Sequence, residues 1–141
     1  LMIIDETDNT DYFLYKFNIS KKDQKRIKII DNFYKEKTQS KTLTENKMNK
    51  VFYYDGKQAV IDILNFMLIK SKKFENTFKE LIEIYENKSI PTMPIGADVL
   101  MTKYKISEGK QLGVKLKMIE EEWVKNNFQI SDQQVENIIN N

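Results

Sequence analysis

Apolar residues recur along most of the chain at spacings of three and four, which place side chains on one face of an α-helix. The clearest series is Leu112, Leu116, Ile119 and Trp123. The run from Ala59 to Lys70 is almost continuously apolar and predicts the most buried helix. One run, Tyr12 to Phe17, has β character, but it is short. The pattern therefore predicts an all-α fold of about six to seven helices with no substantial sheet.

Capping and turn residues indicate where these helices begin and end. Ser20 followed by Asp23 resembles a capping box and predicts a helix that runs to about Lys37. Pro91 and Pro94 prevent a helix from crossing the segment between them, so we expect two helical subdomains, 1–87 and 88–141. Further expected boundaries are Thr42, Thr44, Asp55-Gly56, Ser71, Asn126-Asn127 and the capping box Ser131 with Gln134.

Composition excludes several kinds of chemistry. The chain has no cysteine and no histidine, so disulfides, the usual zinc sites and Ser-His or Cys-His nucleophiles are excluded. The absence of cysteine fits a cytoplasmic protein, and the acidic start is neither a signal peptide nor a transit peptide. No apolar run is long enough to span a membrane. No phosphate-binding loop motif occurs either, and we expect no catalytic and no metal-binding residue.

Glu120, Glu121 and Glu122 form the one acidic run that resembles a metal site. Neighbouring residues on a helix point in different directions, so three consecutive glutamates do not converge on one ion. We expect Glu120 and Glu121 to pair with Lys117 and Lys125 instead, at helical spacing.

Positive charge is concentrated in one part of the chain. Residues 16–50 carry eleven basic and four acidic residues, a net charge of +7, whereas the whole chain has a net charge of +2. On the helix that follows Ser20, four lysines fall within a narrow arc opposite the apolar face. Such a stripe suits RNA phosphates, although it also occurs simply as a solvated helix face. The stripe consists of Lys21, Lys25, Lys28 and Lys35.

The turn before the helix of Leu112 is a second candidate phosphate contact. Gly109 opens this helix, and Lys105 and Lys110 flank the turn. The first amides of a helix are unpaired, and a glycine lets a phosphate approach the backbone. The alternative is that Gly113 allows this helix to pack closely against the short helix before it.

Three segments resemble the C-terminal part of bacterial tRNA nucleotidyltransferases, the CCA-adding enzymes, and of the similar poly(A) polymerases. The first is Leu14 with Asn18-Ile19-Ser20, and the second runs from Tyr54 to Ala59. The third and most specific contains Pro94, Ile95, Gly96, Asp98, Val99 and Leu100, then Ile106, Gly109, Leu112, Gly113, Leu116, Ile119, Glu120 and Trp123.

The resemblance implies an all-α body and tail that bind the acceptor and T-arm of tRNA by shape and phosphate contacts. It places catalysis, with Mg²⁺ and ATP or CTP, in an N-terminal head whose glycine-rich segment does not occur in this sequence. We therefore expect an RNA-binding portion without catalytic residues or cofactor, with 1–87 as body and 88–141 as tail. The alternatives are a helical module that docks on a partner, such as a separate catalytic head, through Tyr12 and Phe13, or an inactive remnant.

Overall fold

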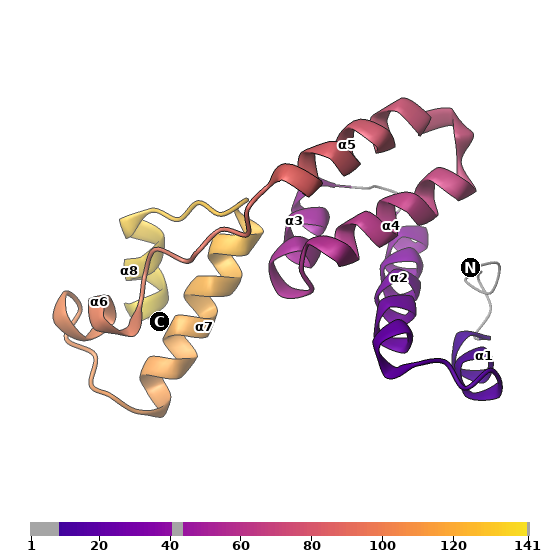
Figure 1. Cartoon of the computed structure of the whole chain (residues 1–141). Helices are drawn as coiled ribbons and strands as arrows, with labels where there is room; N and C mark the ends of the chain where they lie inside the picture. The colour runs from indigo at the N-terminus through magenta and orange to yellow at the C-terminus, as the bar shows by residue number, and fades with distance from the viewer. Residues whose placement is uncertain (1–8, 41–43, 141) are drawn as a thin grey trace.

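The computed structural model describes residues 9–40 and 44–140, and all regular structure in these ranges is helical. Figure 1 shows two groups of helices joined by an extended connection that follows α5. The described ranges contain eight α-helices and one short 3₁₀ helix. They are α1 (Thr10–Lys16), α2 (Lys21–Ser40), α3 (Glu45–Tyr54), α4 (Lys57–Lys70), η1 (Lys72–Phe74), α5 (Glu75–Asn87), α6 (Ala97–Thr102), α7 (Lys110–Lys125) and α8 (Asp132–Asn140).

The all-α prediction is confirmed, but the expected number of helices is too low because of α1. The segment with β character forms a helix in which Phe17 N–H donates to the Phe13 carbonyl at 3.1 Å. Thr10 and Leu14, four residues apart, are both buried. A short segment that buries one such pair against a neighbouring helix is most stable as a helix, because the helix also satisfies its backbone hydrogen bonds locally.

Most predicted helix boundaries in the described residues agree with the structure, although α2 continues to Ser40 instead of ending near Lys37. The Ser20 hydroxyl accepts from Asp23 N–H at 3.2 Å, and α2 begins at the next residue. Thr44 caps α3, whereas Thr42 lies outside the described residues. Ser131 and Gln134 form the reciprocal bonds of a capping box before α8.

The first group of helices, α2 to α5, encloses one hydrophobic core. α4 contributes most of it, as its apolar sequence predicts, and it lies between α2, α3 and α5. Large side chains such as Phe52 and Phe66 are almost completely inaccessible. The core residues are Ile30, Phe33, Met48, Phe52, Val60, Ile63, Leu64, Phe66, Met67, Phe78 and Tyr85.

The second group, α6 to α8, encloses a smaller core of Leu100, Leu112, Ile119 and Val135. Residues from the connecting segments complete it, among them Ile95, Tyr104 and Ile130. The two cores lie on either side of residues 88–92, close to the boundary expected from the prolines. The division into body and tail stays a prediction.

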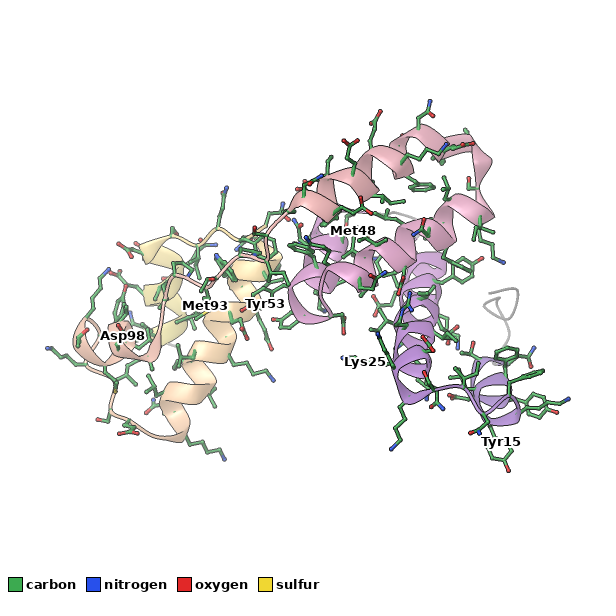
Figure 2. The ribbon with its side chains drawn as sticks, in the orientation of Figure 1. Tyr15, Lys25, Met48, Tyr53, Met93 and Asp98 are labelled. Atoms are coloured by element: carbon green, nitrogen blue, oxygen red, sulfur yellow. The ribbon has the colours of Figure 1, made fainter. Side chains whose placement is uncertain are left out.

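The two groups meet where α3 packs on the last turns of α7. The Tyr53 ring contacts Trp123 edge to face at a centroid distance of 5.3 Å, and its hydroxyl donates to Glu120 at 2.7 Å. Phe128 packs on Trp123 as well, and its ring centroid lies 6.1 Å from that of Tyr53, so the three rings form one cluster. Figure 2 shows Tyr53 at this junction. The sequence's one tryptophan therefore joins the two cores.

A buried amide completes the junction. Asn49 on α3 is 1% exposed, and its carbonyl oxygen accepts from the Tyr85 hydroxyl at 3.0 Å and from the Lys88 ammonium at 3.1 Å. Its amide nitrogen donates to Asn127 at 3.2 Å. The Lys88 ammonium also lies within 6 Å of the Phe128 ring centroid, at 5.8 Å. Asn49 thus connects α3, α5 and the loop after α7 through one side chain.

Candidate nucleic-acid interface

The first two turns of α2 present three lysines to solvent. Lys21, Lys22 and Lys25 are all exposed, and within the described part of the chain none of them forms an ion pair. Ser20 fixes the start of this helix, so the three ammonium groups project from ordered backbone. Figure 2 shows Lys25 extending from α2 into solvent. These residues, called here the α2 lysine group, are cations available to an anionic ligand.

The two other lysines of the predicted stripe are less available. Lys28 forms an ion pair with Asp11 of α1 at 2.9 Å, and Lys35 forms one with Asp31 on its own helix at 3.1 Å. Each pair neutralises the charge that a phosphate would attract. The four lysines therefore differ in their surroundings: Lys28 and Lys35 each have a carboxylate partner, whereas Lys21 and Lys25 form no ion pair in the described residues. Phosphate contact by the four-lysine stripe stays a prediction.

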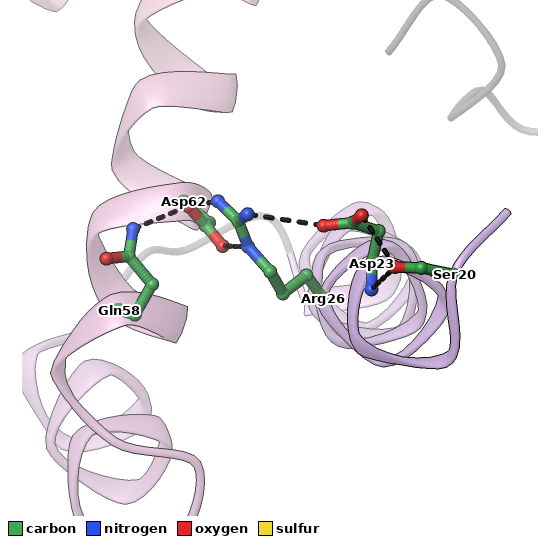
Figure 3. A network of polar contacts seen from close by, with 5 residues as sticks. All are labelled: Ser20, Asp23, Arg26, Gln58 and Asp62. Carbon is green, nitrogen blue, oxygen red and sulfur yellow. Dashed lines mark hydrogen bonds and ion pairs between the residues drawn. The ribbon is translucent and has the colours of Figure 1, made fainter.

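Arg26, the chain's one arginine, is turned toward α4 instead of solvent (Figure 3). Its guanidinium donates twice to Asp62, at 2.7 and 2.8 Å, and once more weakly to Asp23 at 3.4 Å. Gln58 donates to the same Asp62 carboxylate at 2.9 Å. The planar guanidinium fork matches a carboxylate in this bidentate arrangement. Arg26 therefore fixes α2 on α4.

The pKa values of this pair follow from its geometry. Hydrogen bonding to Asp62 and the charge of Asp62 raise the pKa of Arg26 above its ordinary value. For Asp62, burial favours the neutral carboxyl, but the hydrogen bonds from Arg26 and Gln58 outweigh burial and hold its pKa below the ordinary value. The two side chains are 43% and 9% exposed, so the Asp62 end of the pair is the more shielded from water.

The second candidate contact lies at the start of α7. Lys105, Gly109 and Lys110 are all exposed, as the phosphate interpretation requires. Gly109 has φ 146° and ψ −167°, a conformation that only glycine adopts readily. Lys105 also has a positive φ of 59°. The conformation of this turn therefore depends on having a glycine at position 109.

Gly113 does not have the packing role that the alternative interpretation gave it. The residue is exposed on α7, and a Cβ atom placed there would meet no atom within 4 Å. Close packing against α6 is therefore not the reason for a glycine at this position. Leu112 and Ile119, on the buried face of α7, make that contact instead.

The structure does not bring the two groups of predicted residues together. α2 belongs to the first group of helices and α7 to the second, and the two helices do not contact each other (Figure 1). Lys105 and Lys110 therefore form a separate, smaller basic surface. Among the side chains that the structure describes, only the α2 lysine group presents three cations without ion pairs on consecutive turns.

The acidic run on α7 agrees with the expectation in part. Lys117 lies 3.9 Å from Glu121, as expected, but Lys125 pairs with Glu122 at 3.4 Å. Glu120 accepts from Tyr53 instead of pairing with a lysine, because it lies toward α3. Burial, and then this hydrogen bond, raise the pKa of Tyr53 to about 12. In the described residues no group of three or more acidic side chains is placed to hold a metal ion.

Reasoning from the sequence identified the outer side of α1 only in part, because it named Tyr12 as exposed but not Tyr15 or Phe17. Tyr15 is 87% exposed and Phe17 is 60% exposed, together with Tyr12 at 63%. Phe13, expected to be exposed with Tyr12, is half-buried and packs on Phe17 at a centroid distance of 4.5 Å. The spacing of Thr10 and Leu14 could have indicated a helix whose opposite face carries Tyr12 and Tyr15. Tyr12 and Tyr15, which share the outer side of the helix, are called here the α1 aromatic face; Phe17, the residue that ends α1, lies on the side of Phe13.

No helix in the described residues is both long enough and apolar enough to cross a membrane. Comparison with protein-family models, with curated proteins and with solved structures finds no match to this chain. The similarity to the nucleotidyltransferases therefore rests on the sequence segments quoted above.

Proposed function

We propose that this chain binds structured RNA, chiefly the acceptor and T-arm region of tRNA, as the C-terminal portion of a tRNA nucleotidyltransferase or poly(A) polymerase. The observation that carries the proposal is the α2 lysine group, three exposed cations without ion pairs on the first turns of one helix. The segments that resemble this family support the same proposal.

The mechanism is electrostatic. Each lysine that contacts a phosphate releases condensed counterions from the RNA, and this release supplies sequence-independent affinity. A-form RNA exposes its phosphates and 2′-hydroxyls and hides its base edges in a deep, narrow groove, so a helix that presents lysines reads shape rather than sequence. Arg26 contributes by holding α2 against α4, so that the lysines project from a fixed backbone.

Nucleotide addition itself belongs, in this proposal, to a catalytic head with its own Mg²⁺ and nucleoside triphosphate. The α2 helix would bind the RNA and would take part in no chemical step. Lys105 and Lys110, at the start of α7, are available for a second phosphate contact if the RNA extends past the first group of helices.

Salt dependence tests the proposal. A fluorescently labelled tRNA is titrated with the full chain at 50 and 200 mM monovalent salt. Three phosphate contacts predict a Kd that rises by about 30-fold between these concentrations. No binding at 50 mM, or binding that is insensitive to salt, contradicts the proposal. The second of these results would favour apolar docking on the RNA or on a protein partner.

A further inference from the structure

We infer that the α1 aromatic face is a stacking platform for unpaired RNA nucleotides next to the duplex that the α2 lysine group contacts. This inference rests on the proposed function and adds the kind of RNA that the surface takes. It begins from the two most exposed aromatic side chains of the described structure, Tyr15 and Tyr12.

α1 is anchored without the help of these side chains. Thr10 and Leu14 are 3% and 4% exposed and form the inner face of the helix, and Asp11 reaches Lys28 of α2 at 2.9 Å. Figure 2 shows Tyr15 projecting from α1 into solvent. Tyr12 and Tyr15 contribute little to the core, so folding alone does not account for them.

The charges around this face favour RNA as the occupant. Lys16 lies on α1 itself, with its ammonium 5.6 Å from the Tyr12 ring centroid, and the α2 lysine group begins five residues later. Residues 9–25 carry four lysines and two acids, Asp11, which pairs with Lys28, and Asp23, which is hydrogen-bonded to Ser20. A protein partner that binds through apolar contacts does not require lysines around the rings, whereas a single nucleic acid strand binds through both cations and aromatic rings.

Exposed rings beside lysines are the combination that binds single strands. Every base has a π-face, so stacking on tyrosine or phenylalanine tolerates any sequence, and each stacked base strengthens binding by roughly 5- to 100-fold. The turn from Phe17 to Ser20 joins α1 directly to the lysines of α2, and Asn18 in this turn has a positive φ of 47°. The rings of α1 and the lysines of α2 are thus neighbours along the chain, and the inference requires that a strand leaving a duplex on α2 turns onto the outer side of α1.

Two RNA probes test the inference with the full chain. One is a blunt RNA hairpin, and the other is the same hairpin with six unpaired nucleotides at its 3′ end. We expect the tail to increase the affinity of the unchanged protein at least five-fold. Tyr15→Ser should abolish this increment while leaving the blunt hairpin's affinity unchanged, and Tyr15→Phe should retain it because the ring remains.

Tyr54→Ser is the matched control, since Tyr54 is another tyrosine with a partly exposed ring but lies on α3. It should leave the tail increment unchanged. Circular dichroism should show the same Tm for Tyr15→Ser as for the unchanged chain, because the Tyr15 side chain is exposed.

The outcomes separate the two proposals. If the blunt hairpin binds with salt-dependent affinity but the tail adds nothing, the stacking platform is wrong and the proposed function stands. If neither probe binds at low salt, both are wrong. If light scattering shows dimers that Tyr15→Ser converts to monomers, and the tail has no effect, the face joins two copies of the chain and the inference is overturned.

Discussion

The guanidinium of Arg26 and the carboxylate of Asp62 are joined by two hydrogen bonds, of 2.7 and 2.8 Å, that link α2 to α4. Thirty-six residues separate the two in sequence. The contact fixes the helix that carries the α2 lysine group, and it also engages the chain's one arginine with a carboxylate. Its consequences for stability and for RNA binding can be measured separately.

Replacing Asp62 with asparagine should lower the free energy of unfolding by about 1 kcal/mol at neutral pH, a value reduced because Arg26 is 43% exposed. The pKa of Asp62 is below its ordinary value of 3.8 in the folded state. The contribution is therefore fully present above that value and is lost as the pH falls below it. Urea unfolding of the unchanged protein and of Asp62→Asn, at pH 7 and at pH 3, measures the difference in their free energies of unfolding. If this difference is the same at both pH values, the account is contradicted.

The two glycines of α7 should respond to alanine in opposite directions. Gly109→Ala should cost about 1–3 kcal/mol because its backbone conformation is essentially restricted to glycine. Gly113→Ala should stabilise the protein by up to about 1 kcal/mol, since the position is helical and exposed with open space for a methyl group. Thermal unfolding followed by circular dichroism measures the Tm of both variants. A lower Tm for Gly113→Ala would show that the position packs against something.

Tyr53→Phe should destabilise the protein by about 1 kcal/mol, because it removes the hydrogen bond to Glu120 and keeps the ring packed on Trp123. The pKa of Tyr53 is raised to about 12, so its contribution is complete below pH 10 and is lost as the pH rises toward 12. The difference in tyrosinate absorbance between the two proteins measures this titration. Ionisation of Tyr53 near its ordinary value of 10.0 would contradict the predicted hydrogen bond.

Asn49→Ala should be the most destabilising of these substitutions, by about 2–3 kcal/mol. It leaves the Tyr85 hydroxyl without its acceptor and takes away one partner of Lys88 in a buried junction. Asn65→Ala, at an exposed position on α4 away from the junction, is the control. Denaturant unfolding that gives the two variants equal stability would show that the amide does not hold the junction together.

The sequence predicted the helices better than the contacts between them. Periodicity and capping residues such as Ser20 and Ser131 are local signals, and they placed most helix ends within a few residues. α1 was missed because its continuous run of aromatic and aliphatic residues, Tyr12 to Tyr15, is also typical of a short strand. Only its position against α2, which buries Thr10 and Leu14, decides in favour of a helix.

The candidate interface could be predicted only in part, because it too depends on contacts between helices that are distant in sequence. That Lys21 and Lys25 share a helix face with Lys28 follows from helical geometry. That Asp11 engages Lys28, and that Asp62 engages Arg26, depends on tertiary contacts across seventeen and thirty-six residues. Charge counting along the sequence cannot separate a paired lysine from an unpaired one.

The double substitution Lys21→Glu and Lys25→Glu tests the central claim most directly. Its matched control is Lys73→Glu with Lys117→Glu, an equal charge change at exposed lysines away from the α2 lysine group. Both variants are titrated against labelled tRNA at 50 mM salt. The account predicts that the α2 variant loses at least ten-fold in affinity, with a smaller salt dependence, while the control changes by less than about three-fold. Unchanged tRNA binding by the α2 variant, or an equal loss in both variants, would contradict it.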